Sequence, residues 1–222
     1  IGSKTIDWLE ENRPDIVILY SGYSPYLIRL LKWCSLNRVP LIFHAVEWYD
    51  ASNFLESLTP FYLNIELAMR YFSTKVNGVL VISKYLENYY KKNKVKTFKI
   101  PPIIDMTEYR DTFERKSGLN LIYPGYPAAR KDRLDLVLKA LNEMDQSNHR
   151  ISLTLAGMNR KDYEAYSKLH GIRETKFDLN IKGKLDNKDL KKEIALSDYS
   201  IFVREIARFS KAGFPTKYVD SV

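Results

Sequence analysis

The feature that most constrains this chain is a repeated alternation of short apolar runs with amphipathic stretches. The apolar runs predict strands at 15–20, 41–44, 79–82 and 98–100, and again at 119–123, 151–155, 179–181 and 199–203. The amphipathic stretches predict helices at 26–36, 61–72, 84–92, 132–144 and 187–196, and a last helix from about Thr216. Strands that are apolar almost throughout and alternate with helices predict parallel sheets covered on both faces.

This alternation restarts after a polar stretch, so the sequence predicts two α/β units. The first is expected to span 1–104 and the second 118–222, joined by a linker at about 102–118. The first unit lacks an opening strand with a phosphate-facing loop, and the second stops inside a helix. Both units are therefore expected to be incomplete.

Composition sets broad limits on function. The 222 residues are 45% hydrophobic and 28% charged, which is typical of a globular protein. The formal net charge of +8 suits an anionic partner such as nucleic acid, anionic lipid or a phosphorylated substrate. The basic run 91–96 fits such a partner, or simply a solvated surface. A single cysteine, Cys34, cannot form a disulfide framework, which fits a cytoplasmic protein.

The sequence lacks the motifs that mark several other kinds of active site. There is no Asp-x-Asp pair to bridge a metal to a diphosphate and no Cys/His cluster for zinc. The phosphate loop of NTP hydrolases and the serine elbow of α/β-hydrolases are also missing. No metal and no cofactor is therefore expected.

The motif with the clearest chemistry is Gly213-Phe-Pro-Thr-Lys217. A Gly-Pro turn that enters a helix leaves backbone amides unpaired, and with the helix dipole these attract phosphate. Thr216 can add a hydroxyl and Lys217 a charge. Asp220, about one turn further on, can accept hydrogen bonds from a ribose diol. Taken alone, the motif also fits a capped helix that follows a surface loop.

The order of motifs along nearly the whole chain resembles that of GT4-type glycosyltransferases. Arg204 followed by the Gly-Phe-Pro helix and an acidic residue is similar to their C-terminal domain, as is Tyr123-Pro-Gly125 followed by Arg130-Lys131. The strand that ends at His44 resembles one in their first domain. The Gly-Phe-Pro-Thr-Lys version looks most like bacterial polysaccharide and lipopolysaccharide assembly enzymes. The resemblance implies the GT-B fold: two Rossmann-like domains whose parallel sheets face each other across a cleft.

The resemblance also implies roles for individual residues. His44 would contact the transferring sugar as the catalytic candidate, and Asp220 would hold the ribose. The expected donor-diphosphate residues are Gly125, Arg130, Lys131, Arg204, Gly213, Pro215, Thr216 and Lys217. The alternative for each basic residue is a solvated surface charge, and for His44 a histidine bonded within the core.

The implied reaction moves a sugar from a UDP- or GDP-sugar to a hydroxyl of a saccharide or lipid-linked acceptor. The family's usual outcome is retention of anomeric configuration, and no metal is needed. Peripheral contact with the inner face of the plasma membrane is a further hypothesis, since acceptors in this family are often lipid-linked. A nucleic-acid partner is not expected.

Two departures from the family pattern keep alternatives open. The family usually has two glutamates separated by seven residues; Asp220 fills the second place, but Ala212 occupies the first. Tyr126 stands where an arginine often follows the first glycine. A nucleotide-sugar 2-epimerase-like enzyme is one alternative. Such an enzyme needs acid/base carboxylates and histidines in its cleft, and the alanine at 212 and the small number of histidines, three in all, argue against it. A non-catalytic GT-B partner subunit is the other.

Overall fold

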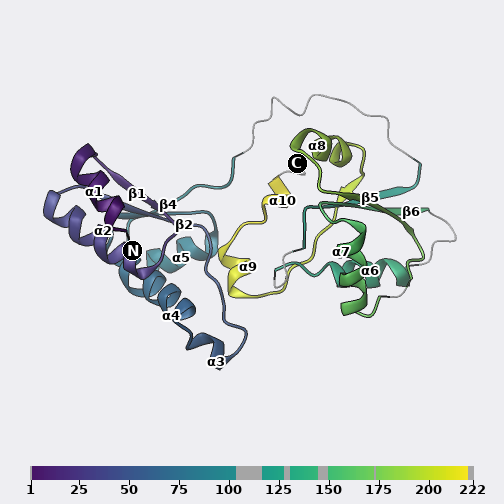
Figure 1. Ribbon diagram of the computed structural model, residues 1–222, viewed down its shortest axis with the longest axis horizontal. Coiled ribbons are helices and arrows are strands. Elements are labelled where there is room, and N and C mark those ends of the chain that lie inside the picture. Colours follow the sequence, from purple (N-terminus) through teal and green to yellow (C-terminus); the bar gives the residue numbers. More distant parts are fainter. Residues whose placement is uncertain (1, 104–116, 128–130, 145–149, 173, 220–222) are drawn as a thin grey trace. The chain divides into compact units, whose positions relative to one another are not determined.

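The computed structural model describes residues 2–103, 117–127, 131–144, 150–172 and 174–219, and these form two compact units (Figure 1). The first unit consists of 1–102 together with 206–214. The second consists of 103–205 together with 215–222. Residues 206–214 thus belong to the first unit, although the division expected from the sequence places them in the second.

The first unit is built on a four-stranded parallel sheet in the order β1-β2-β3-β4. Its strands are β1 (Val17–Tyr20), β2 (Leu41–Ala45), β3 (Gly78–Val81) and β4 (Thr97–Lys99). Each corresponds to a predicted strand. Because parallel neighbours need a crossover, helices lie between them in the sequence, as predicted.

The helices of the first unit are α1 (Ser3–Asn12), α2 (Ser24–Asn37), α3 (Phe54–Ser57), α4 (Pro60–Leu67), α5 (Lys84–Lys92) and α9 (Arg208–Ala212). The helix predicted over 61–72 is divided, because α4 continues into a wider π-turn at Ala68–Phe72 and a 3₁₀ turn at Ser73–Lys75. Helix α5 has the bounds predicted for it, and Ser83 caps it: the Ser83 hydroxyl accepts a hydrogen bond of 3.3 Å from the Leu86 amide.

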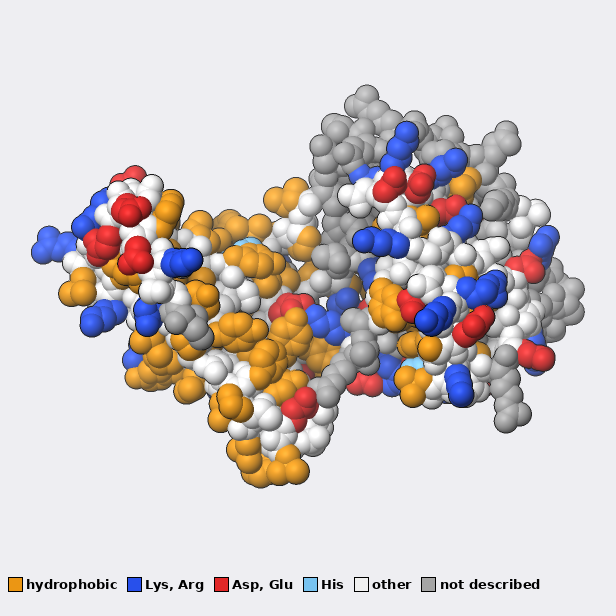
Figure 2. Space-filling view, in the orientation of Figure 1, with side chains coloured by type: hydrophobic (Ala, Val, Ile, Leu, Met, Phe, Trp, Pro, Cys, Tyr) orange, Lys and Arg blue, Asp and Glu red, His pale blue; other side chains and the backbone are white. Residues whose placement is uncertain are grey.

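The core of the first unit lies on one face of its sheet. Leu41 and Phe43 of β2 pack there with side chains of α2 and α5. Alternate residues of the strands point to the other face, where Ile18 is 57% exposed and Tyr20 68%. Within the described ranges this sheet is therefore not covered on both faces, contrary to the pattern predicted from its apolar strands. Hydrophobic side chains are also exposed on α3, as Figure 2 shows.

The second unit has its own four-stranded parallel sheet, in the order β7-β6-β5-β8. Its strands are β5 (Leu119–Pro124), β6 (Ile151–Ala156), β7 (Asp178–Gly183) and β8 (Tyr199–Ser200). Its helices are α6 (Leu134–Glu143), α7 (Arg160–Leu169), α8 (Asn187–Ala195) and α10 (Thr216–Val219). Leucines of α6 pack on β5 and β6 to form the core. None of the helices in the described ranges has the length and apolar character needed to cross a membrane.

Candidate functional site

Glycines mark the carboxyl ends of the strands in the second unit. Gly125 follows β5 with φ +85°, and Gly157 follows β6 with φ +127°. The Gly125 amide donates to the Ala156 carbonyl at 2.5 Å, and the Gly157 amide donates to the Gly183 carbonyl at 2.6 Å. Open α/β sheets bind ligands at this end of their strands, and backbone without side chains lets a ligand approach closely.

A buried carboxylate lies beside this loop. Asp132 lies two residues before the start of α6 and is 5% exposed. Its Oδ2 is 2.8 Å from Lys217 Nζ, and its Oδ1 is 3.0 Å from Arg204 Nε. The backbones of Asp132 and Arg204 also form an isolated antiparallel bridge. One carboxylate thus holds two cations that are 72 and 85 residues away in the sequence.

The charge of Asp132 is maintained by these partners. Burial alone raises the pKa of the carboxyl, but hydrogen bonds and charge interactions with Lys217 and Arg204 outweigh it, so the pKa lies below its usual value. The cluster of Asp132, Lys217 and Arg204 carries two positive charges and one negative. It is therefore a net cationic site beside the glycine loop.

Lys217 lies deep in this cluster. Its ammonium donates to the Tyr123 hydroxyl at 2.8 Å and lies 4.1 Å from the centre of the Tyr123 ring. Burial lowers the pKa of Lys217, and the Asp132 carboxylate opposes this shift. Burial also raises the pKa of Tyr123, as does the nearby Asp132 charge, so its hydroxyl stays protonated. A Cβ on Gly125 would lie 3.3 Å from Lys217 Cε, so the glycine loop and α10 are in direct contact.

Lys131 and Pro215 are two further predicted donor residues that the structure describes. Lys131 precedes Asp132 and is partly exposed, and Pro215 accepts a 3.0 Å backbone hydrogen bond from Tyr218 at the turn into α10. Thr216 begins α10, but its side chain lies outside the described part. Arg130 and Asp220 also lie outside the described residues. The structure thus brings Gly125, Arg204 and Lys217 together.

Gly213 belongs to the first unit, where it ends α9. Its amide donates to the Phe209 carbonyl at 2.9 Å. This differs from the expectation that the amides from Gly213 to Thr216 face a phosphate, because the Gly213 amide is used within its own helix.

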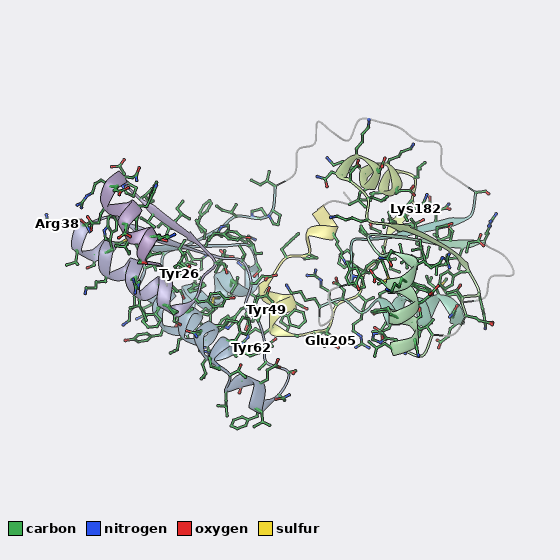
Figure 3. All side chains as sticks on the ribbon, viewed as in Figure 1. Tyr26, Arg38, Tyr49, Tyr62, Lys182 and Glu205 are labelled. Atoms are coloured by element: carbon green, nitrogen blue, oxygen red, sulfur yellow. The ribbon has the colours of Figure 1, made fainter. Side chains whose placement is uncertain are left out.

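An arginine that the sequence analysis did not single out attaches α9 to the first unit. Arg208 lies 2.8 Å from an Asp50 oxygen and 2.5 Å from a Glu66 oxygen, and its guanidinium is 4.6 Å from the centre of the Trp48 ring. It also donates to the backbone carbonyl of Tyr49, which Figure 3 labels. Ala212, at the position of the missing acid, is fully buried in the same core.

His44 lies on β2 of the first unit. Its ring makes an edge contact with Tyr20 at 5.2 Å, on the less covered face of the sheet. Its Nε2 is buried and has no hydrogen-bond partner within the described ranges. Burial lowers the pKa of His44, so the ring is neutral at pH 7. A small cavity of about 50 Å³ at the ends of β1 and β2 is lined by other residues, among them Ser21, Gly22 and Glu47.

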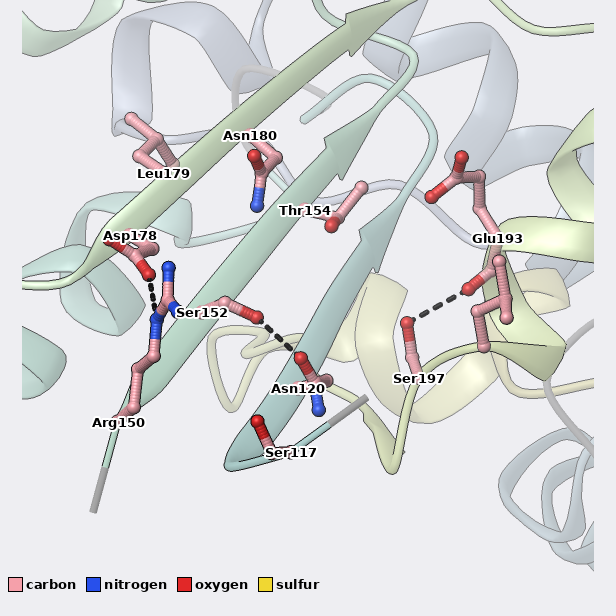
Figure 4. A pocket seen from close by; sticks show the side chains of 11 residues that line it. Ser117, Asn120, Arg150, Ser152, Thr154, Asp178, Leu179, Asn180, Glu193 and Ser197 are labelled. Atoms are coloured by element: carbon pink, nitrogen blue, oxygen red, sulfur yellow. Dashed lines mark hydrogen bonds and ion pairs between the residues drawn. The ribbon is translucent and has the colours of Figure 1, made fainter. Parts of the chain in front are cut away.

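The second unit also has a larger hollow of about 610 Å³ on the face of its sheet (Figure 4). Its floor is polar: Asn120 Oδ1 accepts a 2.9 Å hydrogen bond from Ser152, and Thr154 and Asn180 stand on the next rung. Arg150 and Asp178 close one side with an ion pair. This hollow begins at the amino ends of the strands, so it is separate from the glycine loop.

Two α/β units with parallel sheets, the second with a glycine loop and cations at its strand ends, define an incomplete GT-B fold. Comparison with solved structures supports this assignment of the fold. HepE from Anabaena in complex with UDP-glucose matches with 14% identity and a TM-score of 0.62, over 99% of this chain and 59% of that one. A TarM variant from S. aureus with fondaparinux, alpha-GlcNAc-glycerol and UDP matches with 11% identity and a TM-score of 0.58, over 97% and 42%.

A glycosyltransferase from Rickettsia africae matches with 13% identity and a TM-score of 0.56, over 90% of this chain and 54% of that one. The chain therefore spans less than two thirds of the length of each of these three structures. At such identities the likeness establishes the fold. No protein-family model matches the sequence, and no curated protein matches it.

Proposed function

We propose that this chain is part of a glycosyltransferase that moves a sugar from a UDP- or GDP-sugar to a hydroxyl acceptor. The observation that carries the proposal is the cationic cluster of Arg204, Lys217 and Asp132 beside Gly125. It lies at the carboxyl ends of the strands, where a GT-B unit offers a site for a nucleotide. The structures with UDP-glucose, and with UDP and a glycoside, support a nucleotide-sugar donor and a saccharide acceptor.

In the proposed reaction, the bond between the sugar's anomeric carbon and the diphosphate oxygen breaks. A new bond forms to the acceptor oxygen, which loses its proton, and the nucleoside diphosphate leaves. Arg204 and Lys131 would stabilise the negative charge that develops on the leaving group, with the start of α10 adding its dipole. Asp220 would hold the ribose and His44 would act in the acceptor unit. Retention, independence from metal and membership of the GT4 family belong to the same proposal.

A non-catalytic partner subunit is the second candidate, and Ala212 favours it. An alanine has no carboxylate to offer a sugar, and this one is fully buried in the core of the first unit. Such a subunit would keep the fold and would not turn over a donor.

Contact with a membrane surface is a further part of the proposal, together with a cytoplasmic location and a role in capsule or lipopolysaccharide assembly. The basic run 91–96 begins in the last turn of α5, where Lys91 pairs with Glu87 at 2.6 Å. Flotation with neutral and with anionic liposomes tests it. Binding to anionic liposomes that weakens with added salt is expected, whereas equal recovery with both would contradict a basic contact.

Titration calorimetry with UDP and GDP, followed by an assay for free monosaccharide from UDP-glucose, tests the function. Binding of one nucleotide together with slow sugar release supports the transferase, because water can replace a missing acceptor. Binding without release over long incubation favours the partner subunit. No binding of either nucleotide contradicts both the donor site and the proposed function.

A further inference from the structure

The two cations of the cluster differ in how many of their donors the protein uses. Lys217 is 12% exposed and its Nζ contacts Asp132 Oδ2 and the Tyr123 hydroxyl, each at 2.8 Å. The Tyr126 carbonyl lies 3.5 Å from the same nitrogen. An ammonium has three donors, so those of Lys217 are directed at protein acceptors. Lys217 therefore connects α10 to β5 and to the glycine loop.

Arg204 is held differently. Within the described ranges, its side chain bonds through Nε alone, to Asp132 Oδ1 at 3.0 Å. A guanidinium carries five N–H donors, and the four on its Nη atoms remain for another partner. The side chain is 19% exposed, so it reaches solvent. Such a guanidinium can pair with two oxygens of a phosphate at once, which a lysine ammonium cannot do in the same geometry.

Asp132 connects Arg204 and Lys217, because each of its two carboxylate oxygens binds one of these cations. Its backbone is fixed too: the adjacent Arg133 amide donates to the Val203 carbonyl at 2.8 Å. Arg133 also pairs with Glu205, labelled in Figure 3, at 2.8 Å. Val203 and Glu205, the neighbours of Arg204 in the sequence, are therefore both bound to Arg133, the neighbour of Asp132.

We propose that Asp132 is a positioning residue of the donor site, that Arg204 is the cation it presents to the diphosphate, and that Lys217 has a structural role. The inference rests on the proposed function and deepens it. By binding Nε, Asp132 fixes the plane of the guanidinium and leaves both Nη groups for the ligand. By binding Lys217 as well, it is neutralised, so that it repels the diphosphate less than a lone carboxylate would.

The test is a calorimetric titration with UDP and with uridine, at one ionic strength, of the wild-type chain and of Asp132→Asn. The expected result is a loss of UDP affinity of about tenfold or more, the size of a lost charged hydrogen bond, with uridine binding unchanged. Arg204→Lys is expected to lose as much, because the guanidinium fork is gone. The double variant should lose no more UDP affinity than Arg204→Lys alone, because both changes disrupt the same ion pair between Asp132 and Arg204.

Several outcomes would overturn the inference. Tighter UDP binding by Asp132→Asn would mean that the carboxylate competes with the ligand, and additive losses in the double variant would mean that the residues act separately. If Asp132→Asn does not fold, Arg204→Lys carries the test. Its UDP affinity should fall about tenfold while its uridine binding stays unchanged, because a lysine cannot pair with two phosphate oxygens as the guanidinium does. Unchanged UDP affinity in Arg204→Lys would overturn the inference.

Arg150→Lys is the matched control, since Arg150 is an exposed arginine of the same unit that pairs with one aspartate. Its UDP affinity should equal that of the wild type. If the wild-type chain binds neither UDP nor GDP, the proposed function fails and this inference fails with it. If the wild type binds UDP and Asp132→Asn binds it equally well, only the inference fails.

Discussion

Gly157 packs directly against Gly125 where the strands of the second unit end. A Cβ on Gly157 would lie 2.7 Å from the Gly125 Cα, closer than real Cβ contacts allow. This contact places the loop after β6 against the loop after β5, and so fixes the backbone beside Lys217. The spacing of the candidate donor site thus depends on two residues that have no side chain.

Replacing Gly157 by alanine should therefore destabilise the second unit. Its φ of +127° is strained for any other residue, and the backbone of Gly125 cannot move aside as a flexible side chain could. We expect a loss of roughly 2–4 kcal/mol in the free energy of unfolding, measured by urea titration. Gly171→Ala is the control, because its φ is +67° with nothing within 4 Å of the added Cβ. Equal losses in the two variants would contradict a packing role for Gly157.

Arg208→Ala should release α9 from the first unit. The change leaves the carboxylates of Asp50 and Glu66 without this partner and removes a cation from the Trp48 ring. Since these groups are about one fifth to one third exposed, we expect a cost of about 1–3 kcal/mol. Hydrogen exchange of residues 206–214 should become faster. Arg150→Ala, which breaks a more exposed pair, should change stability by less than about 0.5 kcal/mol, and unchanged exchange in Arg208→Ala would contradict the attachment.

The first unit should lose stability in acid through Glu87. Hydrogen bonds from Lys91 and Lys84 lower the pKa of this carboxyl from 4.5 to about 2. A group whose pKa is lowered by folding stabilises the folded state above its unfolded pKa, so this contribution is lost as pH falls from about 4.5 to 2. The thermal midpoint of Glu87→Gln should approach that of the wild type across this interval. A constant difference between them from pH 6 to pH 2 would contradict the assignment.

Local patterns in the sequence were sufficient for most of the fold. The strands followed from apolar runs bounded by Pro and Gly, and helix α5 was predicted with its observed bounds because Ser83 is a strong cap. Helix α7 was not predicted, although Asn159 caps it by accepting a hydrogen bond from the Asp162 amide at 2.8 Å. That signal, a capping residue before an amphipathic stretch, could have identified it.

The features that were missed depend on contacts between distant residues. The strand predicted over 199–203 ends at Ser200, because Val203 and Arg204 leave the sheet to pair with the segment at Asp132. Helix α9 has five residues and is held mainly by Arg208, whose partners lie more than 140 residues away. Asp132 entered the sequence analysis only as the first residue of the helix predicted over 132–144. No local pattern indicates that a carboxylate will be buried between two cations from the far end of the chain.

A crystal structure of this chain with UDP is the most direct test of the proposed donor site. The diphosphate is expected beside Gly125, with phosphate oxygens about 3 Å from the Nη atoms of Arg204 and with Asp132 still bound to Nε. The ribose should lie within hydrogen-bonding distance of Asp220. UDP bound elsewhere, for example in the polar hollow beside Asn120, with Arg204 in contact with solvent alone, would contradict it.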